Sequence, residues 1–154
     1  MTKLLFAVAL LVAPAVASAG VPVKHFPAGG PMPAGATTPT AGPPFSGSVL
    51  AGDTLYISGT TDMDRATGHP PEDVKAGAKL VLDNIKRTVE GAGLAMDDLV
   101  WVQVFASDLA YYAAFNEVYR TYFKGPLPAR AFIGAGSLLG GAHFELMGIA
   151  QRSK

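Results

Sequence analysis

The sequence contains no cysteine among its 154 residues, which excludes disulfide bonds, thiol catalysis and a lipid-modified cysteine behind an export signal. Charge is also scarce, because Asp, Glu, Lys and Arg together make up 16% of the chain and their formal sum is zero. No segment is rich in lysine and arginine, so we do not expect nucleic acid as a partner. The histidines His25, His69 and His143 lack the spacing of metal ligands, so no metal site is expected.

Long apolar runs are rare as well, and the longest lies at the start of the chain. Lys3 precedes an apolar stretch over residues 4–16, and a small-x-small pattern follows at residues 17–19. This order is typical of a secretory signal peptide over residues 1–19, which we expect to be cleaved after Ala19. The alternative is an uncleaved anchor, but a membrane-spanning helix needs about 20 apolar residues. The predicted location is periplasmic or secreted, with no membrane contact after cleavage.

The rest of the chain has the length of a single domain. Residues 20–40 are rich in proline, glycine, alanine and threonine without an apolar period, which predicts a flexible lead. The pattern becomes regular over residues 41–154. Since apolar residues make up 49% of the whole sequence, this domain either hides surface in an oligomer interface or simply has a well-filled core.

Hydrophobic periodicity predicts the secondary structure of this domain. Two strands separated by a turn at residues 51–53 are expected around residues 49–50 and 54–59. Apolar residues at steps of three and four predict a helix over residues 73–92. A β-branched and aromatic run predicts a strand over residues 99–106, covered on both faces, and Ser107 or Asp108 would cap a second helix over residues 109–123.

Residues 126–150 carry the pattern that points most directly to chemistry. Two apolar runs, residues 131–135 and 143–150, are joined by a glycine-rich connection and predict two strands. Arg130 opens the first run, and its planar fork of donors suits a carboxylate ligand. Glu145 lies inside the second run, where a carboxylate needs a partner, a solvated cleft or a raised pKa. An acid and a fixed cation beside an apolar pocket indicate proton-transfer chemistry on a small anionic substrate.

The predicted element order is ββαβαββ, which is typical of an α+β fold with both helices on one face of the sheet. Such a sheet leaves its other face in need of cover. We expect a partner subunit to supply that cover.

Short segments spread over residues 40–151 add a resemblance to this interpretation. They are GP at 42–43, GDTLYISG at 52–59, ATG at 66–68, VLDNI at 81–85, EGAG at 90–93, FNEVY at 115–119, YF at 122–123, PAR at 128–130 and FE at 144–145. In this order and spacing they resemble the Rid family, the YjgF-like reactive intermediate deaminases. The resemblance implies a chorismate-mutase-like α+β subunit, with a mixed sheet and two helices on one face, that assembles as a homotrimer with ligand clefts between neighbours.

The resemblance also implies an activity and the residues that carry it. It implies hydrolysis of reactive enamines and imines, such as 2-aminoacrylate, to a 2-keto acid and ammonia without metal or organic cofactor. Arg130 matches the arginine that binds the substrate carboxylate, and Glu145 matches the acid that orients the attacking water. Four further positions match substrate-binding residues of the cleft: Ser58 and Gly59 through their backbone, Asn116, and Phe132 through its main chain.

Three positions depart from the family pattern and keep a second function open. Pro44 stands where the family often has an aromatic residue, Phe132 stands where a small residue is usual, and Met147 replaces a second acid in the last strand. The alternative is a non-catalytic trimeric protein of the same fold that binds small carboxylates or acts as a holdase. Hydrolysis of another C=N or amide-like compound is a third alternative.

Overall fold

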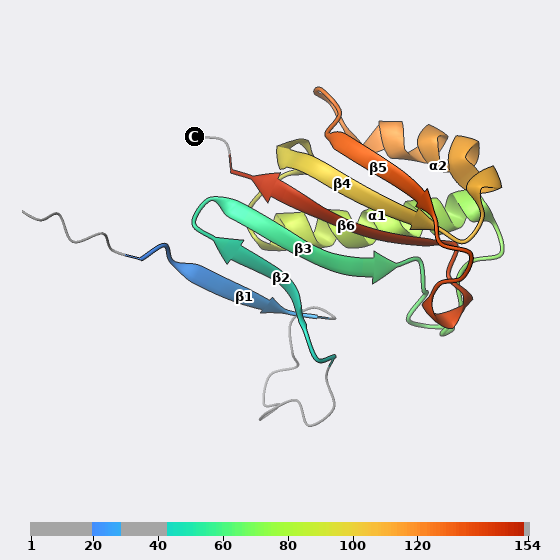
Figure 1. Cartoon of the computed structure of the whole chain (residues 1–154), viewed down its shortest axis with the longest axis horizontal. Helices are drawn as coiled ribbons and strands as arrows, with labels where there is room; N and C mark the ends of the chain where they lie inside the picture. The colour runs from blue at the N-terminus through green and yellow to red at the C-terminus, as the bar shows by residue number, and fades with distance from the viewer. Residues whose placement is uncertain (1–19, 29–42, 153–154) are drawn as a thin grey trace, which may run out of the picture.

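The computed structural model describes residues 20–28 and 43–152, so the predicted signal peptide and most of the predicted lead lie outside the described residues. Within these ranges the chain forms one six-stranded sheet with two α-helices on one face (Figure 1). No helix in this part of the chain is long and apolar enough to cross a membrane. The bounds are β1 Val23–Pro27, β2 Ser46–Ala51, β3 Thr54–Thr61, α1 Val74–Gly91, β4 Leu99–Ala106, α2 Tyr112–Tyr119, β5 Ala129–Gly134 and β6 Phe144–Gln151.

The strands lie in the order β1-β2-β3-β6-β4-β5. The β4–β5 pair is parallel and every other pair is antiparallel. Parallel neighbours need a long crossover connection, and α2 supplies it, so α2 returns across the face of the sheet above β5 (Figure 1). The sheet is therefore mixed, with both helices on one side, as the sequence predicts.

Helix α1 forms because its sequence provides both a cap and an apolar stripe. The Asp73 carboxylate accepts a hydrogen bond from the Lys75 backbone N–H at 3.1 Å, which satisfies a donor of the first turn. The chain leaves the helix through Gly93, whose φ of 78° suits glycine. The buried residues of α1 are Gly77, Ala78, Val81, Leu82, Ile85 and Val89, and they pack on the helix-covered face of the sheet.

The two faces of the sheet differ in cover. Along β4 the side chains of Val102, Val104 and Ala106 are buried under the helices, and the alternating side chains are only partly buried. On this open face Tyr56 is 51% exposed. The sequence predicts cover on both faces of β4, whereas in one copy of the chain only the helix face is covered.

Two further expectations need correction. Residues 20–40 are predicted to be a flexible lead, but Val23–Pro27 forms strand β1, which pairs antiparallel with β2 and makes the observed order βββαβαββ. Its side chains are mostly exposed, so this edge strand carries no alternation that a sequence could reveal. The second helix is predicted over residues 109–123, but only Tyr112–Tyr119 is α-helical, between tighter 3-10 turns at Leu109–Tyr111 and Arg120–Tyr122.

A buried carboxylate joins β3, α1 and β6. Asp62 is fully buried and accepts hydrogen bonds from the backbone N–H groups of His143 and Phe144, at 2.9 and 3.2 Å. Its other oxygen lies 2.9 Å from Nδ1 of His143. Gly77 of α1 makes room for this arrangement, because a Cβ atom there would lie 2.4 Å from Oδ2 of Asp62.

We expect Gly77→Ala to destabilise the fold by about 1–3 kcal/mol, because the added methyl group overpacks the buried Asp62 carboxylate. From helix propensity alone, Gly77→Ala stabilises the fold by about 1 kcal/mol. The control is Gly91→Ala at the end of the same helix, where no atom lies within 4 Å of the added Cβ and stability should be unchanged or slightly higher. Urea unfolding of both variants is the measurement, and equal stabilisation by both would contradict the account.

Candidate functional site

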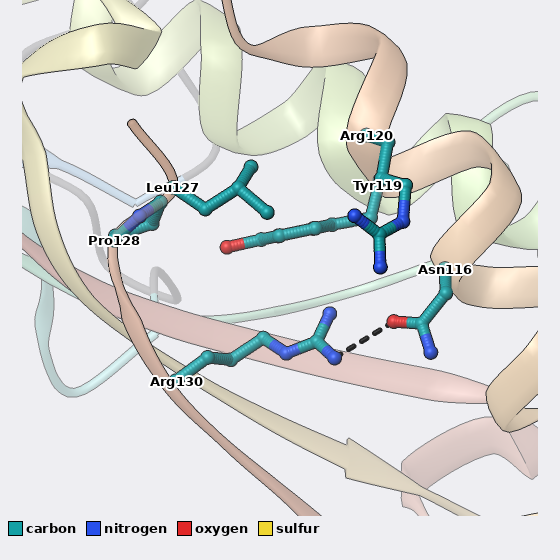
Figure 2. A pocket seen from close by; sticks show the side chains of 6 residues that line it. All are labelled: Asn116, Tyr119, Arg120, Leu127, Pro128 and Arg130. Atoms are coloured by element: carbon teal, nitrogen blue, oxygen red, sulfur yellow. Dashed lines mark hydrogen bonds between the residues drawn. The ribbon is translucent and has the colours of Figure 1, made fainter. Parts of the chain in front are cut away.

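Arg130 lies on the helix-covered face of the sheet, at its edge. It stands opposite Val102 in the parallel β4–β5 register, and Val102 is buried under the helices. From β5 the side chain reaches α2, where its Nη2 donates a hydrogen bond to Oδ1 of Asn116 at 2.7 Å (Figure 2). The structure thus brings together two of the residues that the sequence nominates.

A cavity of about 230 Å³ opens beside this pair. The segment before β5 and one face of α2 form its walls, since residues three and four apart on a helix lie on the same side. Its lining consists of Asn116, Tyr119, Arg120, Leu127, Pro128 and Arg130 (Figure 2). This lining contains two cations and no acid, which suits an anionic ligand.

The Arg130 guanidinium lies among aromatic rings. Its Cζ atom is 4.5 Å from the centre of the Tyr119 ring, and the rings of Tyr112, Phe115 and Phe132 are 5.7–5.8 Å away. Such rings stabilise a cation over their faces. However, Nη1 of Arg130 is buried without a hydrogen-bond partner, and an unpaired buried donor on a charged group is costly. A carboxylate oxygen is the kind of acceptor that suits such a charged donor.

Tyr119 forms a wall of the cavity and offers a second unpaired group. The residue is 3% exposed and its hydroxyl has no hydrogen-bond partner. Burial raises the pKa of Tyr119 to about 12, although the Arg130 charge acts in the opposite direction. The hydroxyl is therefore protonated at neutral pH and able to donate.

Glu145 belongs to a second cluster, on the open face of the sheet. It stands opposite Phe105 of β4 and Thr61 of β3, and Phe105 is three positions along β4 from Val102, so it points to the other face. The carboxylate lies over Gly59, where an added Cβ would be 2.1 Å from Oε1. A register shift in β3 between Ile57 and Thr60 sets this position.

The remaining nominated residues divide between the two clusters. Ser58 lies beside Gly59, and its hydroxyl donates to the Ser46 carbonyl oxygen at 2.6 Å. Phe132 lies on the Arg130 side, where its ring packs edge-on against Tyr112 and Phe115, with centroids 5.0 and 5.5 Å apart.

One copy of the chain thus does not bring Arg130 and Glu145 together. They point to opposite faces of the sheet, and β4 runs between their strands. Glu145 pairs with no cation among residues 20–28 and 43–152. No group of three metal-ligating side chains occurs within these ranges either.

Sequence reasoning missed part of the cavity lining. It does not propose Tyr119, Arg120 or Leu127 as site residues. The available signal was spacing, because Tyr119 and Arg120 stand three and four residues after Asn116 and share its side of the helix.

Comparisons with known proteins agree with this architecture. The family model described as Endoribonuclease L-PSP matches residues 35–152. Among solved structures, the chain is 34% identical to the YjgF gene product of E. coli, with a TM-score of 0.68 over 71% of this chain and 89% of that one. It is 34% identical to E. coli TdcF with bound serine (TM-score 0.69; 75% and 93% covered). It is 36% identical to RidA from an Antarctic Psychrobacter species (TM-score 0.68; 74% and 93% covered).

The raised pKa of Tyr119 predicts a loss of stability in alkali. Below its ordinary pKa of 10.0 the phenol is protonated in both states. Between pH 10 and about 12 only the unfolded chain releases the proton, so the free energy of unfolding falls, by at most about 1.4 kcal/mol per pH unit.

Tyr119→Phe removes this contribution, and its stability should fall less steeply with pH. Urea unfolding at a series of alkaline pH values measures the slope, with Tyr56→Phe on the open face as a half-exposed control. Identical slopes for the wild type and Tyr119→Phe would contradict the assignment.

Proposed function

The chain belongs to the Endoribonuclease L-PSP family, which contains the YjgF and RidA proteins, and we propose from this premise that it hydrolyses reactive enamines and imines. The substrate class is a small 2-imino acid or its enamine, such as 2-aminoacrylate, and the products are a 2-keto acid and ammonia. We further propose that the chain acts in the periplasm or outside the cell, after removal of residues 1–19.

The observation that carries this proposal is the unpaired, buried Nη1 of Arg130 beside a small cavity. A substrate carboxylate placed there accepts from Nη1, while Nη2 stays bonded to Asn116. The structure of E. coli TdcF, to which this chain is similar, holds bound serine, a small molecule that carries a carboxylate. A charge-balanced chain with 12 basic and 12 acidic residues does not favour the phosphate contacts that RNA cleavage needs.

Imine hydrolysis needs little from the protein beyond orientation of the substrate and water, and proton transfer. An enamine first takes a proton at its terminal carbon and becomes an iminium ion, and an imine reaches the same ion by taking a proton at nitrogen. The water oxygen then adds to the iminium carbon while Glu145 accepts a proton from the water. Glu145 returns this proton to nitrogen and then accepts the remaining hydroxyl proton as the C=O bond forms and the C–N bond breaks. The proton passes on to the departing ammonia, which leaves as ammonium. Arg130 holds the carboxylate throughout, which fixes the position of the reacting carbon.

Because Arg130 and Glu145 lie on opposite faces of one sheet, the proposal requires two copies of the chain. We propose a homotrimer in which Arg130 of one copy and Glu145 of the next line the same cleft. The open face supports assembly, since it presents the partly exposed side chains of Tyr56, Trp101 and Phe105. Burying such a face against neighbours is favourable at about 25 cal/mol per Å² of apolar surface.

A non-catalytic carboxylate-binding protein of the same fold is the second candidate. Met147 favours it, because this residue stands on the same face as Glu145, two positions along β6, and leaves the open face of that strand with one acid. This candidate retains the Arg130 cavity and predicts binding of small carboxylates without turnover.

Removing the Arg130 guanidinium should abolish most of the activity. Arg130→Gln keeps a polar side chain but loses the charge-assisted contact to the substrate, which typically costs about 2–5 kcal/mol. We therefore expect kcat/KM for 2-aminoacrylate generated in situ to fall by roughly 30- to 5,000-fold. Arg87→Gln is the matched control, because Arg87 also donates to an asparagine but lies on the exposed side of α1. Wild-type rates in Arg130→Gln would refute the proposed role.

A mixing experiment tests whether the site is shared between copies. Arg130→Gln and Glu145→Gln should each retain little activity alone. When the two variants are unfolded together and refolded as mixed oligomers, about a quarter of the sites should receive an intact Arg130 from one copy and an intact Glu145 from the next. The measurement is imine hydrolysis before and after mixing, and the absence of recovery in mixed oligomers would contradict the shared site.

A further inference from the structure

The cavity beside Arg130 contains a second cation that the proposed reaction does not use. Arg120 is the first residue after α2, and its side chain lines the same cavity as Arg130 (Figure 2). The two guanidinium groups come from different elements, one from the end of the helix and one from β5, and both point into the space between them.

No acid neutralises this pair in the part of the chain that the structure describes. The cavity lining contains no carboxylate. The acidic residues of the neighbouring helix surfaces are engaged elsewhere, since Glu117 pairs with Lys75, and Asp83 pairs with Lys79 and accepts from the Tyr122 hydroxyl. Like charges that share a small space repel one another, so the site gains from a ligand that brings negative charge to both arginines.

The two arginines differ in what they can do. Arg130 is largely covered, and its Nη1 is buried without a partner. Arg120 is exposed to solvent, so it stands at the outer end of the cavity. The apolar side chains of Leu127 and Pro128 line the same cavity, to one side of the two arginines (Figure 2). The lining therefore combines a partly buried cation, an exposed cation and a short apolar wall.

We propose that this cavity takes a ligand with two acidic groups, and that Arg120 determines specificity for the second. The substrate class is then a small 2-imino dicarboxylate: its C1 carboxylate binds Arg130, its methylene groups lie along Leu127 and Pro128, and its distal carboxylate binds Arg120. The claim that such a dicarboxylate is hydrolysed rests on the proposed function, whereas the claim that the cavity binds it does not.

Binding of stable keto acids tests the inference independently of catalysis. The probes are 2-oxoglutarate, with two carboxylates, and 2-oxopentanoate, with the same carbon chain and only one. We expect the wild type to bind 2-oxoglutarate at least about tenfold more tightly by calorimetry, as a charge-assisted contact implies. Arg120→Gln should lose this preference and leave 2-oxopentanoate binding unchanged, and Arg120→Lys should retain part of it.

The contrary outcomes are specific. Equal affinity of the wild type for both keto acids, or equal weakening of both by Arg120→Gln, overturns the inference, as does failure to bind either acid. Arg87→Gln serves as the control for removing a surface arginine of α1. Because Arg120 is exposed, its replacement removes no buried contact from the core, and unfolding curves of the variant verify this.

Turnover separates this inference from the proposed function. Imines generated in situ from glutamate and from norvaline by amino-acid oxidases supply the two substrate types. Faster hydrolysis of the dicarboxylic imine, abolished selectively by Arg120→Gln, supports both statements. Hydrolysis of neither imine, together with the calorimetric preference for 2-oxoglutarate, removes the proposed hydrolase activity and leaves the dicarboxylate site supported.

Discussion

The candidate site depends on one partly buried cation, the guanidinium of Arg130, and on how the fold holds it. The parallel pairing of β4 with β5 requires a crossover, and α2 is that crossover. The same connection places Asn116 and Tyr119 above the arginine, so that the amide fixes Nη2 and the ring lies against the charge. What the fold leaves unsatisfied is Nη1, a charged donor that suits an anionic acceptor.

Because side chains alternate between the two faces of the sheet, the candidate site residues are divided between two surfaces. The side chains of Arg130 and Glu145 point to opposite faces of the sheet. Their partners on β4, Val102 and Phe105, are three residues apart, and side chains alternate between the two faces along a strand. The arginine cluster therefore has a binding group without an acid, and the Glu145 cluster has an acid without a cation. The partly exposed aromatic side chains on the open face provide a reason for copies of the chain to associate. In the proposed reaction assembly and activity are linked, because that reaction uses Arg130 from one copy and Glu145 from another.

Much of the fold could be predicted from the sequence where local signals are strong. The α1 helix has a capping Asp73 and a regular apolar stripe, and β4 has a run of β-branched and aromatic residues, so both lie within one residue of their predicted bounds. Strand β1 could not be found, because an exposed edge strand gains its stability from pairing with β2 and has no pattern of its own. The 3-10 turns on either side of α2 could not be predicted either, since apolar spacing does not distinguish a 3-10 turn from an α-helix.

The candidate site could likewise be predicted only in part, because residue types are read from the sequence but their arrangement depends on the tertiary structure. Arg130 and Glu145 stand out in the sequence as charges in apolar strands, but which face each one occupies depends on register across β4. The sequence signal for Arg120 is only its spacing from Asn116, and its place beside the cavity makes it a candidate. A crystal structure of the assembled protein with 2-oxobutyrate bound tests the central claim most directly. The account predicts a ligand carboxylate about 2.7–2.9 Å from Nη1 of Arg130, with Glu145 of the partner subunit facing the keto carbon. A ligand held without Arg130, or with no Glu145 facing it from any copy, would contradict it.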